Sequence, residues 1–224
     1  MEYLIGLYNR IGALFCHQLP ERTLSIGGMP LPVCARDTGI YLGIFLSTVY
    51  LFVRGRFDSD KPPRTFQAVL LSVLMLPMAF DGVSSYLGVR ETNNFIRLFT
   101  GMSFGLAIPF FLIPAANFKV YGKNSKGVLK NTGELLFLYG VGGLICLAVL
   151  EVQWIPWSIL SGAIIVGVVF LVSRLVFTVI YRCVPMKKES RFWAVSVLTV
   201  SVFIILYFVS SYLLQPLKYL LLKE

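Results

Sequence analysis

Residues 158–181 read SILSGAIIVGVVFLVSRLVFTVIY, a continuous apolar run in which Arg174 carries the only charge. An α-helix rises about 1.5 Å per residue, so a run of this length crosses the roughly 30 Å hydrocarbon core of a bilayer. The apolar residues are continuous rather than alternating, which indicates a transmembrane helix and not a strand of a β-barrel. This stretch predicts an integral membrane protein.

The composition of the whole chain supports the same fold class. Of 224 residues, 57% are hydrophobic and 14% are Asp, Glu, Lys or Arg, whereas a soluble domain carries about 25% charged residues. Residues 3–15 predict a short amphipathic helix at the membrane interface. We expect an all-α, multi-pass domain over residues 1–224, with about six transmembrane helices. The expected spans are 38–53, 65–80, 98–116, 134–150, 158–181 and 192–214.

The chain is basic, with 20 Lys and Arg against 11 Asp and Glu. In a soluble protein this excess would suggest a nucleic-acid partner. Here the basic residues fall in short loops between apolar runs, where they orient the protein, so the expected partner is the lipid bilayer and not nucleic acid. One face holds Arg54, Arg56, Lys61, Arg64, Lys119, Lys123, Lys126, Lys130, Arg182, Lys187, Lys188 and Arg191, and the other holds Arg10, Arg22, Arg36, Arg90, Arg97, Lys218 and Lys223.

This asymmetry predicts that the first set lies in the cytoplasm of a cell-membrane protein. Both termini and the polar segments 16–37 and 81–97 are then extracytoplasmic. Arg174, inside the fifth expected span, is expected to extend its side chain to the interface, with an ion pair to Glu134 as the alternative.

The two polar segments contain the motifs CHQLPERT (16–23), CARDTGIYLG (34–43) and DGVSSYLGVRETNNFIRLFTG (81–101). These motifs resemble a bacterial and archaeal family of integral membrane proteins known as a domain of unknown function. Members of that family look like C-H-Q-x-P-x-R-[ST], then C-A-R-C-x-G-I-Y-x-G, then a D-G segment and N-x-x-R near a glycine-rich helix. This chain has Asp37 where the family has a second cysteine. The resemblance implies a membrane fold and no particular activity.

Cys16, Cys34 and Asp37 are candidate metal ligands, because thiolates and carboxylates are ligand types that zinc accepts. A Cys16–Cys34 disulfide is the alternative on an oxidising face, and it would stabilise the loop by about 3 kcal/mol. Buried, unpaired thiols are a third interpretation. We expect Cys16 and Cys34 to lie close together, and Cys146 and Cys183 to be unpaired.

His17, the only histidine, is a candidate general acid or base, because imidazole titrates near neutral pH. Asp81 is the second candidate catalytic residue, since a carboxylate at the end of a membrane span requires a cationic partner. A structural ion pair of Asp81 with an arginine is the alternative. The candidate residues for binding an anionic substrate are Arg22, Arg36, Arg90, Asn94 and Arg97.

Two glycine pairs predict where these segments meet. Gly39 and Gly43 begin the first span, and Gly101 and Gly105 begin the third. Small residues at this spacing let two helices approach closely. If these two helices pack together, Arg36 and Asp37 come near Arg97.

Three classes of function are compatible with these features. The first is a membrane enzyme or binding protein with a polar His/Asp/Arg site on the extracytoplasmic face, acting on an anionic lipid or lipid-linked substrate. The second is a small transporter, in which proline-containing spans line a path. The third is a structural or assembly protein whose loops are fixed by the disulfide.

Overall fold

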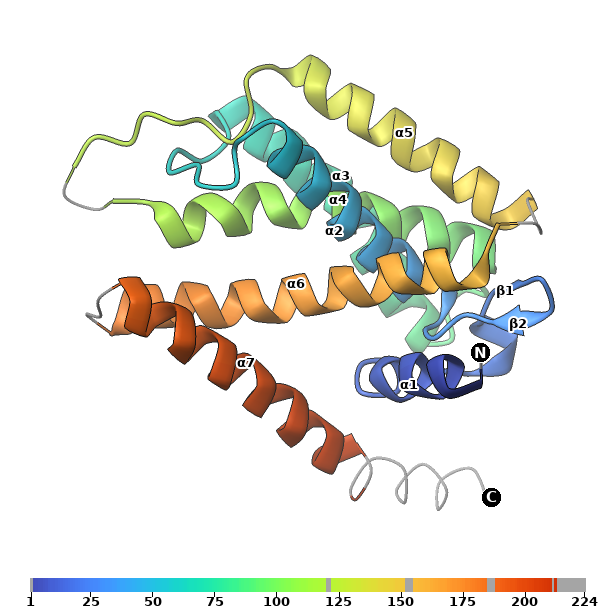
Figure 1. Cartoon of the computed structure of the whole chain (residues 1–224). Helices are drawn as coiled ribbons and strands as arrows, with labels where there is room; N and C mark the ends of the chain where they lie inside the picture. Colours follow the sequence, from blue (N-terminus) through green and yellow to red (C-terminus); the bar gives the residue numbers. More distant parts are fainter. Residues whose placement is uncertain (1, 120–121, 152–154, 185–187, 211, 213–224) are drawn as a thin grey trace.

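The computed structural model describes residues 2–119, 122–151, 155–184, 188–210 and 212, and most of them are helical (Figure 1). The α-helices are α1 (Glu2–Gly12), α2 (Ala35–Val53), α3 (Thr65–Tyr86), α4 (Asn94–Asn117), α5 (Thr132–Glu151), α6 (Trp157–Cys183) and α7 (Lys188–Val209). Between α1 and α2 lie a 3-10 turn, η1 (Pro20–Arg22), and an antiparallel pair of short strands, β1 (Ser25–Ile26) and β2 (Met29–Pro30).

The predicted all-α membrane fold is confirmed. Among the described residues, five helices, α3 to α7, are long and apolar enough to cross a membrane. The first of the six expected spans corresponds to α2, which is not among these five. The first turn of α2 contains Arg36 and Asp37, and these two charged residues lower its mean hydropathy. The last expected span corresponds to α7, which ends at Val209, while residues 211 and 213–214 lie outside the described part.

The packing of α2 against α4 confirms the prediction from the glycine pairs. A methyl group added at Gly39 would lie 2.2 Å from the Leu98 carbonyl oxygen, and one at Gly105 would lie 2.0 Å from the Ile40 carbonyl oxygen. Such distances are shorter than any van der Waals contact, so only glycine permits this approach of the two backbones. The contact brings the polar first turns of α2 and α4 together.

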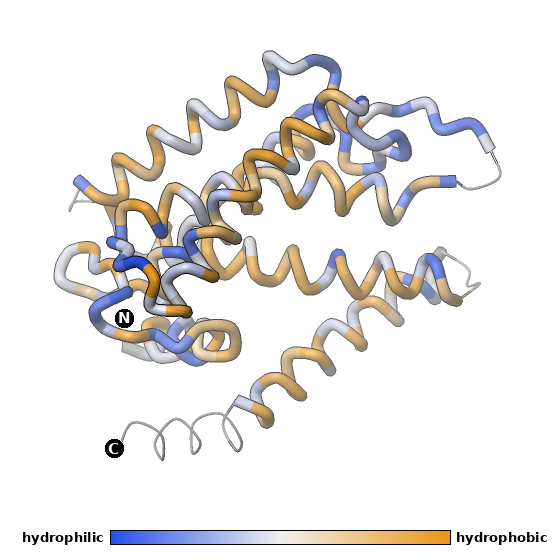
Figure 2. The backbone as a smooth tube through the Cα atoms, turned by 180° about the vertical axis from the view of Figure 1, so that it is seen from behind, coloured by the Kyte–Doolittle hydropathy of each residue, from blue (hydrophilic) through white to orange (hydrophobic). Residues whose placement is uncertain are grey.

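Polar residues are concentrated toward the two ends of the helices, and apolar residues fill their middle parts (Figure 2). At one end lie α1, the β1–β2 pair and the first turn of α2 (Figure 1). At the other end the loops after α2 and α4 are joined, because the backbone N–H groups of Asp60 and Lys61 both donate to the Lys126 carbonyl at 3.1 Å. Arg182, at the end of α6, donates to the Ala115 carbonyl at 2.8 Å and so belongs to this second end. The three basic loops thus share one end, as the predicted topology requires.

Arg174 departs from both interpretations of the sequence. It is 8% exposed, and its guanidinium lies over the rings of Phe57 and Phe177, with 5.2 and 4.7 Å to the ring centroids. Arg174 also donates to the Ile113 carbonyl at 3.3 Å. Aromatic faces and the Ile113 carbonyl near the end of α4 thus hold the cation inside the protein. Glu134 instead accepts from Arg56 at 2.6 Å.

Candidate functional site

A pocket of about 270 Å³ opens at the end of the molecule where α2 and α4 begin. It is lined by Phe15, Cys16, His17, Gln18, Leu19, Arg22, Cys34, Arg36, Asp37 and Arg97. Its walls therefore come from the 16–22 loop, from the first turn of α2 and from the first turn of α4. Seven of the residues proposed from the sequence are in this lining, and Asp81, Arg90 and Asn94 are not.

Gln18 shapes the loop that carries Cys16 and His17. Its backbone has φ of 50°, in the left-handed region, and its N–H lies 3.4 Å from the Cys16 sulfur. Its side-chain amide donates to the Asn9 carbonyl at 2.8 Å and to the Pro32 carbonyl at 2.7 Å. Gln18 thus fastens the loop to α1 and to the segment before α2, and the sequence analysis assigned it no role.

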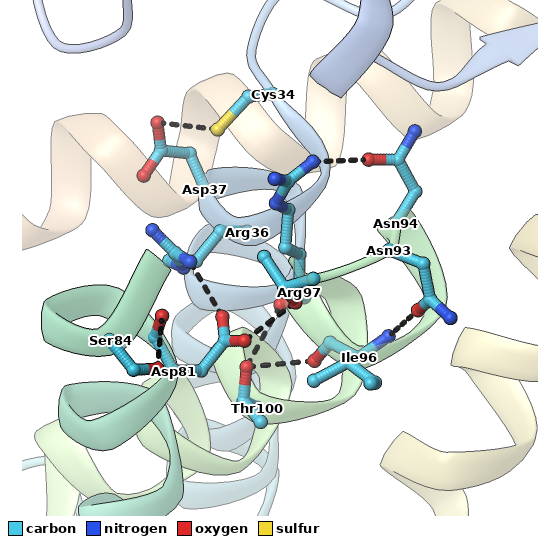
Figure 3. A network of polar contacts seen from close by, with 11 residues as sticks. Cys34, Arg36, Asp37, Asp81, Ser84, Asn93, Asn94, Ile96, Arg97 and Thr100 are labelled. Atoms are coloured by element: carbon cyan, nitrogen blue, oxygen red, sulfur yellow. Dashed lines mark hydrogen bonds and ion pairs between the residues drawn. The ribbon is translucent and has the colours of Figure 1, made fainter. Parts of the chain in front are cut away.

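Cys16, Cys34 and Asp37 form a cluster in which one ligand atom of each lies within 4.8 Å of the others. The Cys34 sulfur lies 3.2 Å from Asp37 Oδ2 (Figure 3). The Cys34 backbone N–H donates to the Cys16 sulfur at 3.1 Å. All four cysteines are free, so the alternative of a Cys16–Cys34 disulfide is not seen, and the expected proximity of Cys16 and Cys34 is confirmed. This cluster could hold a metal ion.

The two thiols of the cluster differ in acidity. The hydrogen bond between the two side chains lowers the pKa of Cys34 and raises the pKa of Cys16. The reason is that Cys34 accepts this bond as a thiolate, while Cys16 must keep its proton in order to donate it. Burial and the Asp37 charge raise the pKa of Cys16 further. Of the two thiols, Cys34 therefore loses its proton first, and Cys16 holds its proton more tightly.

Arg36 and Asp81 form an ion pair behind the pocket. Arg36 Nη2 lies 2.6 Å from Asp81 Oδ2, and Thr92 Oγ1 donates to the other Asp81 oxygen at 2.6 Å. Asp81 is 1% exposed. The expectation that Asp81 ends its helix was wrong, because α3 continues to Tyr86. Arg36 retains a buried Nε without a hydrogen-bond partner among the described residues.

Arg97 lies at the start of α4 and is 8% exposed. Its Nη1 donates to Asn94 Oδ1 at 3.2 Å (Figure 3), and no carboxylate lies within 4 Å of it in the described part of the chain. The Asn94 amide donates in turn to the Glu21 carbonyl at 3.3 Å, which fixes the η1 turn against α4. Asn94 therefore orients Arg97 and, through η1, the segment that carries Arg22.

The remaining candidates occupy the edge of the site. His17 is exposed and lines the pocket. Arg22 lines it too, and its Nε lies 3.8 Å from Glu21 on the surface. Arg90 is exposed in the connection between α3 and α4, outside the pocket lining, and its charge acts on Asp81 from a distance.

Residues 16–111 match the family described as "Predicted membrane protein (DUF2085)". An uncharacterized protein of Methanocaldococcus jannaschii is 34% identical over 112 residues, which make up 50% of this chain and 69% of that protein. An uncharacterized protein of Methanothermobacter thermautotrophicus is 41% identical over 94 residues, 42% of this chain and 79% of that protein. The chain belongs to the DUF2085 family. No solved structure matches the chain.

The matched region coincides with the site of this DUF2085 protein. Residues 16–111 include both polar segments, α2, α3 and most of α4. Every residue that lines the pocket falls within the match except Phe15. The part of the chain that defines the family is therefore the part that builds the pocket, while α5, α6 and α7 lie beyond it.

Proposed function

We propose that this protein binds an anionic group, a phosphate or a carboxylate of a lipid or lipid-linked molecule, in the pocket at the extracytoplasmic face of the cell membrane. One observation carries the proposal: three arginines, Arg22, Arg36 and Arg97, line one pocket that contains a single carboxylate, Asp37. Guanidinium groups bind phosphate and carboxylate oxygens through paired hydrogen bonds.

The partners of the two buried arginines support this assignment. Arg97 has an amide partner rather than an acid, and Arg36 keeps a buried N–H donor unused within the described residues. An unsatisfied buried donor costs about 1–3 kcal/mol, so these groups favour a ligand that supplies acceptor oxygens. A transporter would need polar positions through the middle of the bundle, where apolar residues predominate (Figure 2).

A metal ion at Cys16, Cys34 and Asp37 is the second part of the proposal, and zinc is the metal that these ligand types suit. Two backbone N–H groups, from Gln18 and Cys34, point at the Cys16 sulfur. Hydrogen bonds of this kind orient a thiolate ligand and stabilise its charge. His17, exposed at the same pocket, is the candidate acid or base.

Ligand binding by purified protein in detergent micelles tests the anion-binding role. We expect Arg97→Gln and Arg22→Gln each to weaken the binding of short-chain anionic phospholipids by about tenfold or more, since each removes a charged hydrogen-bond donor. Arg10→Gln is the matched control, because Arg10 is exposed on α1 outside the pocket lining. Equal affinities for all four proteins would refute the proposal.

Elemental analysis tests the metal. Zinc should accompany the purified protein and be lost in Cys16→Ser and Cys34→Ser, while Cys146→Ser retains it, because Cys146 is buried away from the pocket lining. Mass spectrometry of the unreduced protein distinguishes the alternative, since a Cys16–Cys34 disulfide would appear there with no zinc present.

A further inference from the structure

We infer that the metal cluster and the arginines form one composite site, and that its ligand is a terminal phosphate group, that is, a phosphate monoester. This inference rests on the proposed function and names its substrate class. Both sets of side chains line the same pocket: Cys16, Cys34 and Asp37 on one part of the wall, and Arg22, Arg36 and Arg97 on the rest.

The metal cluster supplies three ligands and leaves one position for the bound anion. Within the described residues, His, Cys, Asp and Glu side chains bring three ligand atoms together in this cluster. Zinc in proteins takes four ligands, and sites with three protein ligands keep the fourth position for water or substrate. The cluster borders the pocket, so the fourth ligand comes from whatever the pocket contains, and an oxygen of the bound anion satisfies it.

The bound anion must supply acceptor oxygens to the arginines as well as to the metal. One oxygen of the anion is needed for the metal, and the donors of Arg36, Arg97 and Arg22 need at least two more. A carboxylate has two oxygens, and a phosphodiester has two that are not esterified. A phosphate monoester has three strong acceptor oxygens and carries about −1.5 to −2 charges at neutral pH. Of these three groups, the monoester alone can give the metal one oxygen and leave two further oxygens to the arginines, and it also carries the most negative charge.

The charge of the site agrees with a strongly anionic ligand. The lining holds three arginines and one carboxylate, Asp37, while Asp81 pairs with Arg36 from behind and the exposed Glu21 lies 3.8 Å from Arg22 outside the lining. Zinc adds two positive charges and displaces the one or two protons that the thiols still hold, so its binding does not make the lining more negative. The lining therefore keeps its excess of arginines over carboxylates with or without metal.

The size of the pocket is compatible with two sources of the phosphate, a lipid and a soluble molecule. About 270 Å³ accommodates a phosphate and a small attached group but not an acyl chain, since pockets for drug-sized ligands begin near 300 Å³. A lipid with a terminal phosphate would keep its chains in the bilayer, and a soluble phosphate monoester would fit as a whole.

Reciprocal binding measurements on the full chain in phosphatidylcholine nanodiscs test the inference. Zinc affinity is measured by competition with a chromophoric chelator, with phosphatidic acid (a monoester), phosphatidylglycerol (a diester), glycerol phosphate or no addition. We expect phosphatidic acid to tighten zinc binding by about tenfold or more and zinc to tighten phosphatidic acid binding by the same factor, because coupling between two ligands is reciprocal. Phosphatidylglycerol should change zinc affinity by less than about threefold.

The variants separate the two halves of the site. Arg97→Gln should lose the coupling, whereas Arg10→Gln should keep both the coupling and the zinc affinity measured without phosphate. If Arg97→Gln does not fold, Arg22→Gln replaces it, because the Arg22 side chain is 37% exposed. Coupling by glycerol phosphate equal to that by phosphatidic acid identifies the phosphate alone as the recognised group, and coupling only by phosphatidic acid identifies a lipid.

Each contrary result has a distinct meaning. Zinc and phosphatidic acid that bind independently, or phosphatidylglycerol that couples as strongly as phosphatidic acid, overturn the inference and leave the proposed function intact. A protein that binds neither zinc nor any anionic lipid overturns both.

Discussion

Arg36 Nη2 lies 2.6 Å from Asp81 Oδ2, and this ion pair connects α2 to α3 across 45 positions of sequence. The second Asp81 oxygen accepts from Thr92, so both oxygens of the buried carboxylate are occupied. Asp81 does not line the pocket, whereas Arg36 does. We therefore propose that Asp81, a candidate catalytic residue by its sequence context, acts as a positioning residue that holds the Arg36 guanidinium at the wall of the pocket.

A double-mutant cycle on this pair tests the positioning role. Asp81→Leu should lower the free energy of unfolding by about 3 kcal/mol, because it leaves Arg36 unpaired with its side chain only 13% exposed. Arg36→Met combined with Asp81→Leu should recover most of this loss, since no charge is then buried alone, and it should still fail to bind the anion. Thermal unfolding in detergent gives the stabilities. Additive effects of the two single substitutions would contradict the pair.

The glycine contact between α2 and α4 gives a prediction with a control on the same molecule. Gly105→Ala should destabilise the protein by about 1–3 kcal/mol, because the added methyl would lie 2.0 Å from the Ile40 carbonyl oxygen. Gly140→Ala on α5 should be neutral or stabilising by up to about 1 kcal/mol, because no atom lies within 4 Å of the added methyl. Similar losses for both would show that α2 and α4 are not in close contact.

Two ion pairs at the opposite end should differ in their contribution to stability. The Glu134 side chain is 9% exposed and accepts from Arg56 at 2.6 Å and from the Lys130 backbone at 3.0 Å. Glu134→Gln should therefore cost about 2–3 kcal/mol. Asp58 pairs with Lys126 but is 75% exposed, so Asp58→Asn should cost less than about 1 kcal/mol. A larger loss for Asp58→Asn than for Glu134→Gln would contradict this assignment.

Zinc affinity should fall as the pH is lowered, because both thiols must lose their protons to bind the metal. The lowered pKa of Cys34 lets the first proton leave readily, and the raised pKa of Cys16 retains the second, so binding at neutral pH releases at least one proton. We expect a decrease of roughly tenfold or more per pH unit between about pH 8 and about pH 6. Chelator competition across this range measures it, with Cys146→Ser as the control; a pH-independent affinity would exclude thiolate ligands.

The topology follows from the distribution of basic residues. Reporter fusions after Arg56, Lys126 and Lys188 should all report the cytoplasm, because they lie in the three basic loops. A fusion after Gly88, in the connection between α3 and α4 on the pocket side, should report the extracytoplasmic space. Extracytoplasmic signals at any two of the first three positions would reverse the orientation and place the pocket in the cytoplasm.

Much of the fold and part of the site could be derived from the sequence. Apolar run lengths predicted the helical membrane fold, and Gly39, Gly43, Gly101 and Gly105 predicted the contact of α2 with α4. His17, Arg36, Asp81 and Arg97 were predicted to converge because both polar segments were assigned to one face, and all of these except Asp81 line the pocket. Gln18 belongs to the C-H-Q motif, but neither it nor Thr92 could be assigned a supporting role, because an amide or a hydroxyl in a loop has many potential partners and only the folded chain selects one.

The sequence by itself determined which segments enter the bilayer and where the helices can approach closely. The first property depends on the free energy of transferring each apolar segment from water into the bilayer, and the second depends on the positions of the glycines. Both can be read directly from the order of residues along the chain. Only the tertiary structure decided that Asp81 lies behind Arg36 rather than in the pocket, that Arg90 lies outside it, and that Arg174 lies between aromatic rings. The reason is that a buried charge pairs with whichever group the packing of separate helices brings within a few ångströms. A small change in the length of a helix, such as the extension of α3 to Tyr86, is enough to change that partner.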